Sequence, residues 1–305
     1  MKKRYSVIVP HYEDAARLER LLESIPVERD DVEVIVVDDC SPNQSDLDGV
    51  RLKWPQINWL ATSGNSGAGV ARNVGLDSAT GQWLVFADSD DEFLVDAFGI
   101  FDQMIQPDDE LVYFLAESIQ EGDGSPSIRS EGVNELVAYY YSNPSSATLL
   151  QLKLNHIVPW AKIYSNQFVK SHGFRFDAVK HGNDVAFNVL AAAAANKVSA
   201  FPIPVYRLYR RPGSLTSNLS ADAFMIRFDV SRSVAQRLSE IGLSRVWSAT
   251  GYMVLSLRYG PIIASRVWSQ AICSPMLIEW KRIFDIDRWK RFIFRNRRDL
   301  QEISK

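Results

Sequence analysis

The sequence predicts an α/β protein with a mostly parallel sheet flanked by helices and a helical C-terminal region. Short apolar runs alternate with segments of helical spacing over the first hundred residues. These runs are apolar on both faces, as expected of parallel strands that helices cover on both sides. From about residue 220 the pattern becomes helical. We therefore expect one domain over residues 1–218, followed by a helical region over 219–305.

The first part of the predicted domain contains four strands and two helices. The strands are the runs "YSVIVP" (5–10), "VEVIVVDD" (32–39), "INWLAT" (57–62) and "QWLVFADSDD" (82–91). The helices are "AARLERLLESI" (15–25), with Asp14 as its N-cap, and "GAGVARNVGLDSA" (67–79). The spacing of "GNSGAGVARN" is not that of a dinucleotide fingerprint, so Gly67 and Gly69 are expected to allow a tight entry into the second helix or its close packing.

The pattern after residue 110 is less regular. It predicts a strand over 110–118, a loop over 121–127 and a helix over 130–143. Further on, "NDVAFNVLAAAA" starts a helix at 183, and "YRLYRRPGSLTS" begins as a strand at 206.

Acidic residues follow three of the predicted strands, in the segments "PHYED", "VDDCSPN" and "ADSDD". Because the carboxyl ends of parallel strands meet at one edge of a sheet, these acids are expected on one rim. Clustered carboxylates repel one another and lose hydration, so they need a cation, a helix N-terminus or open water. Each acid alone could open a turn or cap a helix. Together they favour a ligand site.

Composition limits the class of protein. A chain of 305 residues, 46% hydrophobic and 23% charged, is typical of a globular protein. It contains no Walker sequence, zinc-type Cys/His spacing or G-x-S-x-G elbow. Only Cys40 and Cys273 are present, and no apolar segment approaches the ~18 residues that span a bilayer. We expect a cytoplasmic protein without a nucleic-acid partner.

The C-terminal region is basic and rich in tryptophan. Residues 244–305 hold 12 Lys and Arg against 5 Asp and Glu, although the whole chain has a net charge of −3. The four tryptophans in this region are Trp247, Trp268, Trp280 and Trp289. One interpretation is an interfacial surface that holds the protein against anionic lipid at the inner face of the cytoplasmic membrane. The other is a helical subdomain with solvated basic residues.

Several of these segments resemble the successive motifs of family two glycosyltransferases. The matching stretches are "SVIVPHYEDAARLERLLESI", "EVIVVDDCSP" and "NSGAGVARNVGLDSATGQWLVFADSDD", which cover the first hundred residues in order. The resemblance implies a GT-A type, Rossmann-like sheet, with a nucleotide-binding half over 1–110 and an acceptor-side half over 111–218. It also implies a nucleotide-sugar donor, with UDP as the expected nucleotide, and Mn²⁺ or Mg²⁺ as cofactor. Such an ion suits carboxylate ligands and stabilises the charge on the leaving nucleoside diphosphate.

The resemblance assigns a donor-binding role to residues of the predicted rim. It implies that Asp39 hydrogen-bonds the base, that Arg72 lies near the base or diphosphate, and that Asp88 lies near the ribose. Asp88-Ser89-Asp90 is the D-x-D motif, in which Asp90, with Asp88, binds the metal. The residues implied to line the nucleoside pocket are Pro10, Tyr12 and Glu13, where Glu13 replaces an Asn that many relatives carry.

The segment that starts with "VPWAKIYSNQF" resembles the second half of the same family. There a Trp-x-Lys-aromatic strand and a helix precede a Glu-Asp dipeptide whose Asp is the catalytic base. The dipeptide here is Asn183-Asp184, so the role of base passes to Asp184. Attack by an activated hydroxyl opposite the diphosphate inverts the anomeric configuration. The alternative for Asp184 is stabilisation of the helix N-terminus.

Six further residues are candidates for contact with the acceptor or the diphosphate. Trp160 could stack on a sugar or belong to the core, and Lys162 could be a solvated charge. In the family, an Arg followed by Ser or Thr closes over the diphosphate or acceptor, but a basic edge strand is the rival explanation. The full set is Trp160, Lys162, His181, Asn183, Arg211 and Ser214.

Two functional hypotheses follow. The first is a metal-dependent, inverting, hexosyltransferase-like enzyme that transfers sugar to a glycan or lipid-linked acceptor in bacterial surface polysaccharide biosynthesis. The second is a non-catalytic sugar-nucleotide-binding protein, which only the Asn183 departure supports. Nucleotidyl transfer is disfavoured because "VPHYEDAAR" lacks the Gly-rich, basic loop that such enzymes use.

Overall fold

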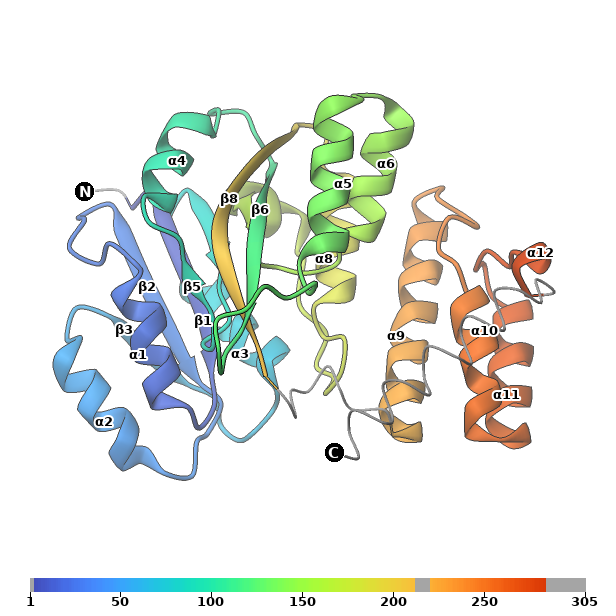
Figure 1. The fold of residues 1–305 in the computed structure, drawn as a ribbon, viewed down its shortest axis with the longest axis horizontal. Helices are drawn as coiled ribbons and strands as arrows, with labels where there is room; N and C mark the ends of the chain where they lie inside the picture. The colour runs from blue at the N-terminus through green and yellow to red at the C-terminus, as the bar shows by residue number, and fades with distance from the viewer. Residues whose placement is uncertain (1–2, 212–219, 284–305) are drawn as a thin grey trace. The chain divides into compact units, whose positions relative to one another are not determined.

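The computed structural model describes residues 3–211 and 220–283. The chain divides into two compact units, residues 1–230 and 231–305. The first unit contains an eight-stranded sheet (Figure 1). Across the sheet, the strands are β3 (Asn58–Ala61), β2 (Val32–Asp38), β1 (Tyr5–His11), β4 (Trp83–Phe86), β7 (Lys162–Ser165), β6 (Leu111–Gln120), β8 (Val198–Arg210) and β5 (Glu92–Phe93).

The sheet is mixed but mostly parallel, which confirms the predicted fold class. Strands β3, β2, β1 and β4 form parallel pairs, and β6 pairs with β8 in parallel. Strand β7 is antiparallel to both β4 and β6, and the short β5 is antiparallel to β8. The carboxyl ends of β1, β2 and β4 therefore lie along one edge.

Helices cover both faces of this sheet. They are α1 (Ala15–Glu23), α2 (Gln44–Lys53), α3 (Ala68–Ser78), α4 (Ala97–Met104), α5 (Glu131–Ser142), α6 (Ser146–Asn155), α7 (Asn166–His172) and α8 (Val185–Ala194). Alternate residues of β1 belong to different cores: Val7 packs with Leu18 of α1, whereas Ile8 packs with Ala71 of α3 and Phe187 of α8. This alternation explains why each strand reads as a continuous apolar run.

The predicted strands and helices of the first unit are present, but the structure has additional elements and Asp14 does not cap α1 with its side chain. Helices α2, α4 and α6 and strand β5 are additional elements that the apolar pattern did not indicate. In α2 only Leu47 and Val50 are buried, so the pattern is too sparse to recognise. Asp14 is at the N-cap of α1, but its carboxylate makes no capping bond to the described helix and instead accepts from Arg17 and Arg211.

The described C-terminal part is helical, as predicted. Its elements are α9 (Ala221–Glu240), α10 (Thr250–Ser256), the 3₁₀ helix η2 (Leu257–Tyr259), α11 (Pro261–Ile272) and α12 (Trp280–Ile283). Trp247 donates to Ser231 Oγ at 2.6 Å and Trp268 donates to the Met253 carbonyl at 2.9 Å, so both are bonded within the second unit. Trp280 is exposed, and Trp289 and the predicted boundary at 218/219 lie outside the described residues.

Within residues 3–211 and 220–283, no helix combines the length and the apolar content that crossing a bilayer requires.

Candidate active site

The loops after β1 and β2 meet at the predicted rim and hold strained backbone. Glu13 and Cys40 have φ angles of 55° and 61°, in the left-handed region that non-glycine residues rarely adopt. The Glu13 amide donates to Ser41 Oγ at 2.8 Å, and Ser41 Oγ in turn donates to Asp38. Such strain persists only where the surroundings impose it, as is common at binding sites.

The Asp39 carboxylate fixes the loop that leads into α3. Its Oδ1 accepts from Thr62 Oγ1 at 2.7 Å and from the Ser66 amide at 3.0 Å, and its Oδ2 accepts from the Gly67 amide at 2.6 Å. A carboxylate offers about four acceptor positions, and three donors use the carboxylate of Asp39 here. Gly67 has a φ of 88° at the N-cap of α3, which fits the predicted tight entry into this helix.

The first strand supplies the other predicted nucleoside contacts. Pro10 is buried within β1, whereas Tyr12 follows that strand and exposes 42% of its surface. Tyr12 and Glu13 thus provide accessible side chains at the rim, while Pro10 contributes to its floor.

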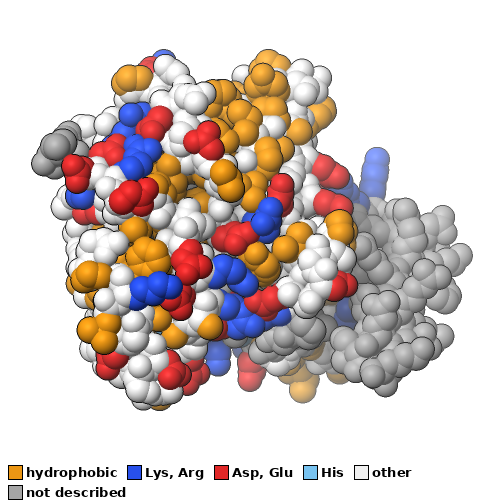
Figure 2. Space-filling model, turned by 60° about the vertical axis from the view of Figure 1, so that its left-hand side comes forward, with side chains coloured by type: hydrophobic (Ala, Val, Ile, Leu, Met, Phe, Trp, Pro, Cys, Tyr) orange, Lys and Arg blue, Asp and Glu red, His pale blue; other side chains and the backbone are white. Residues whose placement is uncertain are grey.

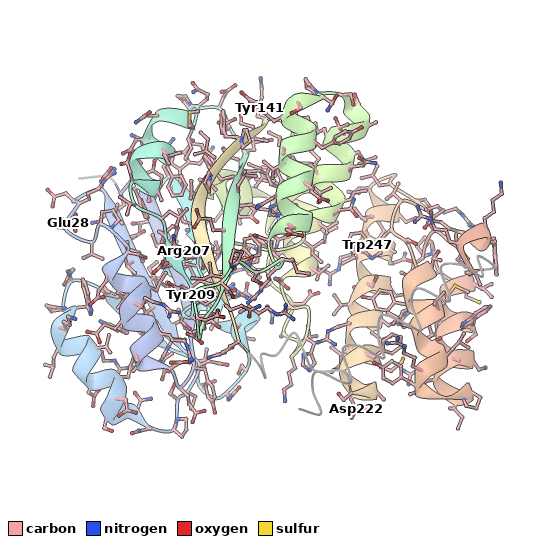
Figure 3. The ribbon with its side chains drawn as sticks, in the orientation of Figure 1. Glu28, Tyr141, Arg207, Tyr209, Asp222 and Trp247 are labelled. Atoms are coloured by element: carbon pink, nitrogen blue, oxygen red, sulfur yellow. The ribbon has the colours of Figure 1, made fainter. Side chains whose placement is uncertain are left out.

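The backbone of the acidic segment after β4 is held by α1 and β8. The Asp88 amide donates to Tyr206 Oη at 2.9 Å, and Arg20 donates to the Asp90 carbonyl at 2.5 Å. Asp91 is fully buried, and its Oδ1 accepts from the Tyr209 amide at 3.1 Å. Figure 3 shows Tyr209 and Arg207 along β8. Asp91 therefore points into the protein rather than toward the rim.

The two outer acids of the D-x-D segment keep partly exposed carboxylates. Asp88 is paired with Arg72 at 2.5 Å, and Asp90 lies 3.5 Å from Arg211 Nη2. Burial, followed by the charge of Asp88, raises the pKa of Asp90, and the charge of Arg211 opposes this shift. Two hard oxygen ligands beside each other suit Mn²⁺ or Mg²⁺. Within residues 3–211 and 220–283, no group of three or more His, Cys, Asp or Glu side chains is arranged to hold a metal ion.

Asp184 occupies the N-cap position of α8 but does not act as a cap. Its carboxylate makes no capping hydrogen bond within the described helix. Burial raises the pKa of Asp184, and the nearby charge of Arg72 opposes this shift. A hydrogen-bonded cap is therefore absent, while attraction to the helix dipole is still an alternative role for this carboxylate.

Arg72 connects the two halves of the site. It is only 5% exposed, and it donates to Asp88 Oδ1 at 2.5 Å and to Asn183 Oδ1 at 2.9 Å. Its guanidinium lies 5.4 Å from the centre of the Phe176 ring. A Cβ at Gly69 would meet the Asp177 carbonyl at 2.4 Å and Asn183 Cβ at 2.8 Å, so this glycine permits the close approach predicted for α3.

The remaining candidates separate into buried and accessible groups. Trp160 is 4% exposed and stacks on Tyr206 in the core, and Lys162 is 1% exposed, which corrects the idea of a solvated charge. His181 is also buried, and burial lowers its pKa. Arg211 is partly exposed and pairs with Asp14 and Asp90. Ser214 lies outside the described residues.

Three residues of the site were not identified from the sequence: Arg20, Tyr206 and Asn188. Arg20 and Tyr206 hold the backbone of Asp90 and Asp88 from elements far away in the chain, which no local pattern reveals. Asn188 could have been noticed, because it is a polar residue inside the apolar run "VAFNVLAAAA". A buried polar side chain normally has hydrogen-bond partners.

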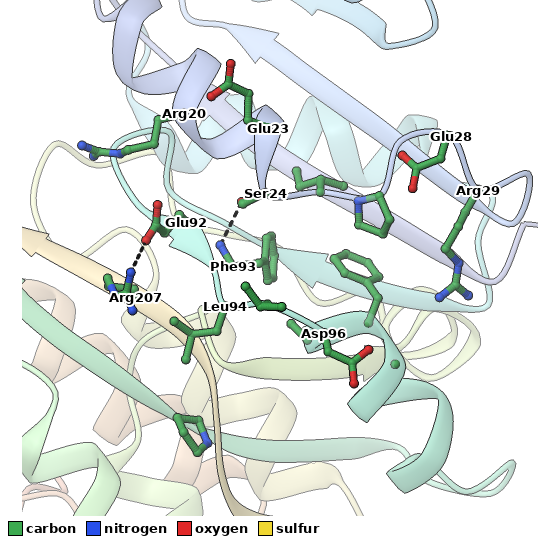
Figure 4. Close-up of a pocket in the computed structure, with 17 residues that line it drawn as sticks. Arg20, Glu23, Ser24, Glu28, Arg29, Glu92, Phe93, Leu94, Asp96 and Arg207 are labelled. Carbon is green, nitrogen blue, oxygen red and sulfur yellow. Dashed lines mark hydrogen bonds and ion pairs between the residues drawn. The ribbon is translucent and has the colours of Figure 1, made fainter.

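A pocket of about 920 Å³ lies beside the acidic segment, between the end of α1, β5 and the start of α4 (Figure 4). Of the predicted site residues that the structure describes, none lines it. Ser24 Oγ accepts from the Phe93 amide at 2.9 Å, and Arg207 pairs with Glu92 at 2.6 Å. Figure 2 shows acidic and basic side chains interspersed over one face, with no large area of a single charge.

The fold and the site define a glycosyltransferase of the GT-A type. The chain belongs to glycosyl transferase family 2, whose model matches residues 6–173. Among curated relatives, the succinoglycan biosynthesis protein ExoO of Rhizobium meliloti is 27% identical over 279 residues, which cover 81% of this chain and 75% of ExoO. The poly(ribitol-phosphate) beta-N-acetylglucosaminyltransferase TarS of Staphylococcus aureus is 28% identical over 214 residues, or 67% of this chain but only 35% of TarS.

Solved structures show the same fold. TarS in complex with UDP-GlcNAc aligns with a TM-score of 0.58 and 21% identity, covering 88% of this chain and 73% of that one. The mannosyltransferase PcManGT from Pyrobaculum calidifontis, in complex with GDP-Man and Mn²⁺, aligns with a TM-score of 0.53 and 16% identity, covering 90% and 76%. The family match and the curated relatives confirm the predicted enzyme class, a glycosyltransferase.

Proposed function

We propose that the chain is a metal-dependent, inverting glycosyltransferase that moves a sugar from a UDP-sugar to a glycan or lipid-linked acceptor in bacterial surface polysaccharide biosynthesis. TarS, which shares the fold and binds UDP-GlcNAc, supports the donor, and ExoO supports the pathway. The observation that carries the proposal belongs to this chain: buried Arg72 bonds both Asp88 of the D-x-D segment and Asn183 beside Asp184. A donor held at Asp88 would thus have its reactive carbon near the partly buried carboxylate of Asp184.

The donor would lie along the carboxyl ends of β1, β2 and β4. The remaining acceptor position of Asp39 suits an N–H of the base. The residues proposed to contact the nucleoside are Pro10, Tyr12, Glu13 and Asp39, and those proposed for the ribose and diphosphate are Arg72, Asp88, Ser89 and Asp90.

Asp88 and Asp90 would hold Mn²⁺ or Mg²⁺ together with diphosphate oxygens. When bound, the ion stabilises negative charge on the departing nucleoside diphosphate. In the protein alone, Arg211 pairs with the Asp90 carboxylate at 3.5 Å. Arg211 and Ser214 are proposed to contact the diphosphate or the acceptor after the donor has bound.

Asp184 is the proposed general base. Its carboxylate takes the proton of the acceptor hydroxyl while that oxygen forms a bond to C1 and the bond from C1 to the diphosphate oxygen breaks. Because burial raises the pKa of Asp184, its ionised form is a stronger base than an ordinary carboxylate. Asp91 is unsuited to this role, since it is buried and accepts from the Tyr209 amide. His181 and Asn183, which precede Asp184 in the chain, are proposed to contact the acceptor.

The proposed domains are a catalytic domain over 1–218 and a C-terminal region that touches anionic lipid, so that the enzyme is peripheral at the inner membrane face. Basic residues outnumber acidic ones in 244–305 by 12 to 5, which supports this contact. If it exists, vesicles with anionic lipid bind the protein at low salt and release it as salt rises. Equal recovery on neutral and anionic vesicles would reject the membrane contact.

A thermal-shift screen with turnover measurements tests the proposed function. Nucleoside diphosphates and nucleotide sugars are compared with and without Mn²⁺, because a ligand that binds the folded state raises the melting temperature. We expect stabilisation by UDP that depends on Mn²⁺, together with slow release of UDP from a UDP-sugar. Stabilisation by another nucleotide alone would reject the UDP-sugar donor. Tight binding without turnover on a broad acceptor panel would favour the non-catalytic alternative.

A further inference from the structure

Lys162 is a lysine in the interior of the first unit. It is 1% exposed, and lysine is almost never fully buried unless it is paired. Its Nζ donates to two neutral oxygens, the His156 carbonyl at 2.5 Å and Asn188 Oδ1 at 3.0 Å. Burial lowers the pKa of Lys162 well below its ordinary value, and the nearby Asp184 opposes this shift. Burial of such a polar group is costly, so it needs an explanation beyond packing.

Asn188 connects this lysine with the start of α8. Its Oδ1 accepts from both Lys162 Nζ and Tyr164 Oη, the latter at 2.5 Å. Its Nδ2 donates to the Asp184 carbonyl at 2.8 Å, and the Asn188 backbone amide donates to the same oxygen at 3.0 Å. Because two donors face Oδ1, the orientation of the amide is determined. The main chain of Asp184 is therefore held by a side chain that Lys162 orients.

The segment that carries Lys162 is strained as well as buried. Ala161, directly before it, has a φ of 52°, a conformation that alanine rarely adopts. Both ring nitrogens of buried His156 and the hydroxyl of Tyr113 have no hydrogen-bond partner among the described residues. Strain and unsatisfied polar groups gathered at one place are typical of functional sites.

We propose that Lys162 and Asn188 are positioning residues for Asp184, forming a buried connection from β7 to the first turn of α8 that fixes the base against the donor. This inference rests on the proposed function, in which Asp184 is the base. It replaces the earlier expectation that Lys162 contacts acceptor or diphosphate, since Lys162 reaches the site only through Asn188 and by its charge. The charged groups that act on Asp184 are Arg72 of α3, Asp88 after β4 and Lys162 of β7.

The experiment compares Lys162→Met, Asn188→Leu and their combination in the full-length protein. The substrate is the UDP-sugar that the wild type cleaves fastest with Mn²⁺, and UDP affinity is measured separately by thermal shift. We expect kcat to fall about 10- to 100-fold in both single variants, because an error of about 1 Å in a reacting group costs this much. UDP affinity should change less than about threefold, and the double variant should resemble the single ones, as expected of residues that act as a unit.

The pH profile separates positioning from simple structural support. Loss of the Lys162 cation should raise the pKa of Asp184, so the acid limb of the kcat profile should move to higher pH in Lys162→Met. Asn188→Leu retains Lys162, so it should shift the acid limb of the kcat profile less than Lys162→Met does. Should Lys162→Met not fold, Asn188→Leu still tests the connection through its split between kcat and UDP affinity.

Lys153 of α6 provides a matched control, because it bonds the opposite end of α8. Its Nζ donates at 2.6 Å to the carbonyl of Ala195, the C-cap of α8, and burial lowers its pKa too. Lys153→Met should retain kcat and the pH profile. The inference would be overturned if Lys162→Met kept the wild-type kcat and an unchanged acid limb, or if Lys153→Met lost as much activity as Lys162→Met. Either result would leave the proposed function intact. Absence of UDP release by the wild type from every sugar nucleotide would instead overturn the proposed function.

Discussion

Arg211 Nη2 lies 3.5 Å from Asp90 Oδ2, at the carboxylate that is proposed to bind the metal. The same guanidinium donates to Asp14 Oδ2 at 3.1 Å, so it links the end of β8 to the start of α1. Burial and the Asp88 charge raise the pKa of Asp90, and Arg211 only partly compensates. A divalent ion would supply the missing positive charge, and it would compete with Arg211 for the same oxygen.

The first prediction concerns this carboxylate. Asp90→Ala should retain the fold but lose the stabilisation by UDP that depends on Mn²⁺, because an oxygen ligand is removed. Melting temperatures with UDP, with and without Mn²⁺, provide the measurement. Asp108→Ala, at an exposed acid paired with Lys197, should behave like the wild type. Unchanged Mn²⁺ dependence in Asp90→Ala would reject the metal assignment.

The second prediction concerns Arg72. Arg72→Lys should lose one of the bonds to Asp88 and Asn183, because an ammonium cannot reproduce the planar fork that serves both. Leaving part of a buried network unpaired should lower the free energy of unfolding by about 1–3 kcal/mol. Denaturant unfolding measures this loss. Arg51→Lys on exposed α2 is the control, and an equal change in both variants would argue against a special role for Arg72.

The third prediction uses two glycines. Gly69→Ala should destabilise the protein by about 1–3 kcal/mol, because overpacking forces the backbone apart where the Cβ would meet Asp177 and Asn183. Gly49→Ala in α2 meets nothing within 4 Å, so it should stabilise by about 0.4–1 kcal/mol. Chemical unfolding of both variants tests this difference in sign. A stabilising Gly69→Ala would mean that α3 can move away from the 177–183 loop.

The sequence alone predicts the parts of the fold that depend on residues close together in the chain. Strands β1, β2 and β4 are predictable because each is apolar on both faces, and the rim acids follow from where these strands end. The pairing of β8 with β6 and β5 brings Tyr206 to Asp88, although 118 residues separate them in the sequence. No sequence pattern near either residue predicts that contact.

The burial of Lys162 could not be predicted from the sequence either, but for a different reason. Lysine is usually solvated, so composition alone pointed to the surface. Its interior position depends on oxygens from His156 and Asn188, which belong to two other elements. The sequence therefore identified the rim of the site and missed the buried network beneath it.

The fourth prediction is a pH dependence of stability in the ligand-free protein. Burial raises the pKa of Asp184 above the unfolded value of 3.8. For a group whose folded pKa is raised, the associated stability is fully present below the unfolded pKa and is lost as pH rises through the folded pKa. Asp184→Asn removes this titration, so it should exceed the wild type in stability at neutral pH and lose that advantage toward pH 3.8. Thermal unfolding across this range would reveal the opposite order if the carboxylate stabilised the helix.

The last prediction separates catalysis from binding at the same residue. Asp184→Asn keeps the size of the side chain but removes its basicity, so donor binding should persist while transfer falls by roughly 10²- to 10⁴-fold. Asn is nearly as good an N-cap as Asp, so a purely structural Asp184 would leave the variant active. The measurements are the transfer rate and the UDP-dependent thermal shift, with Asp177→Asn in the neighbouring loop as the comparison. Turnover at the wild-type rate would remove Asp184 from the mechanism, and Asp91 could not replace it without leaving its buried place beside β8.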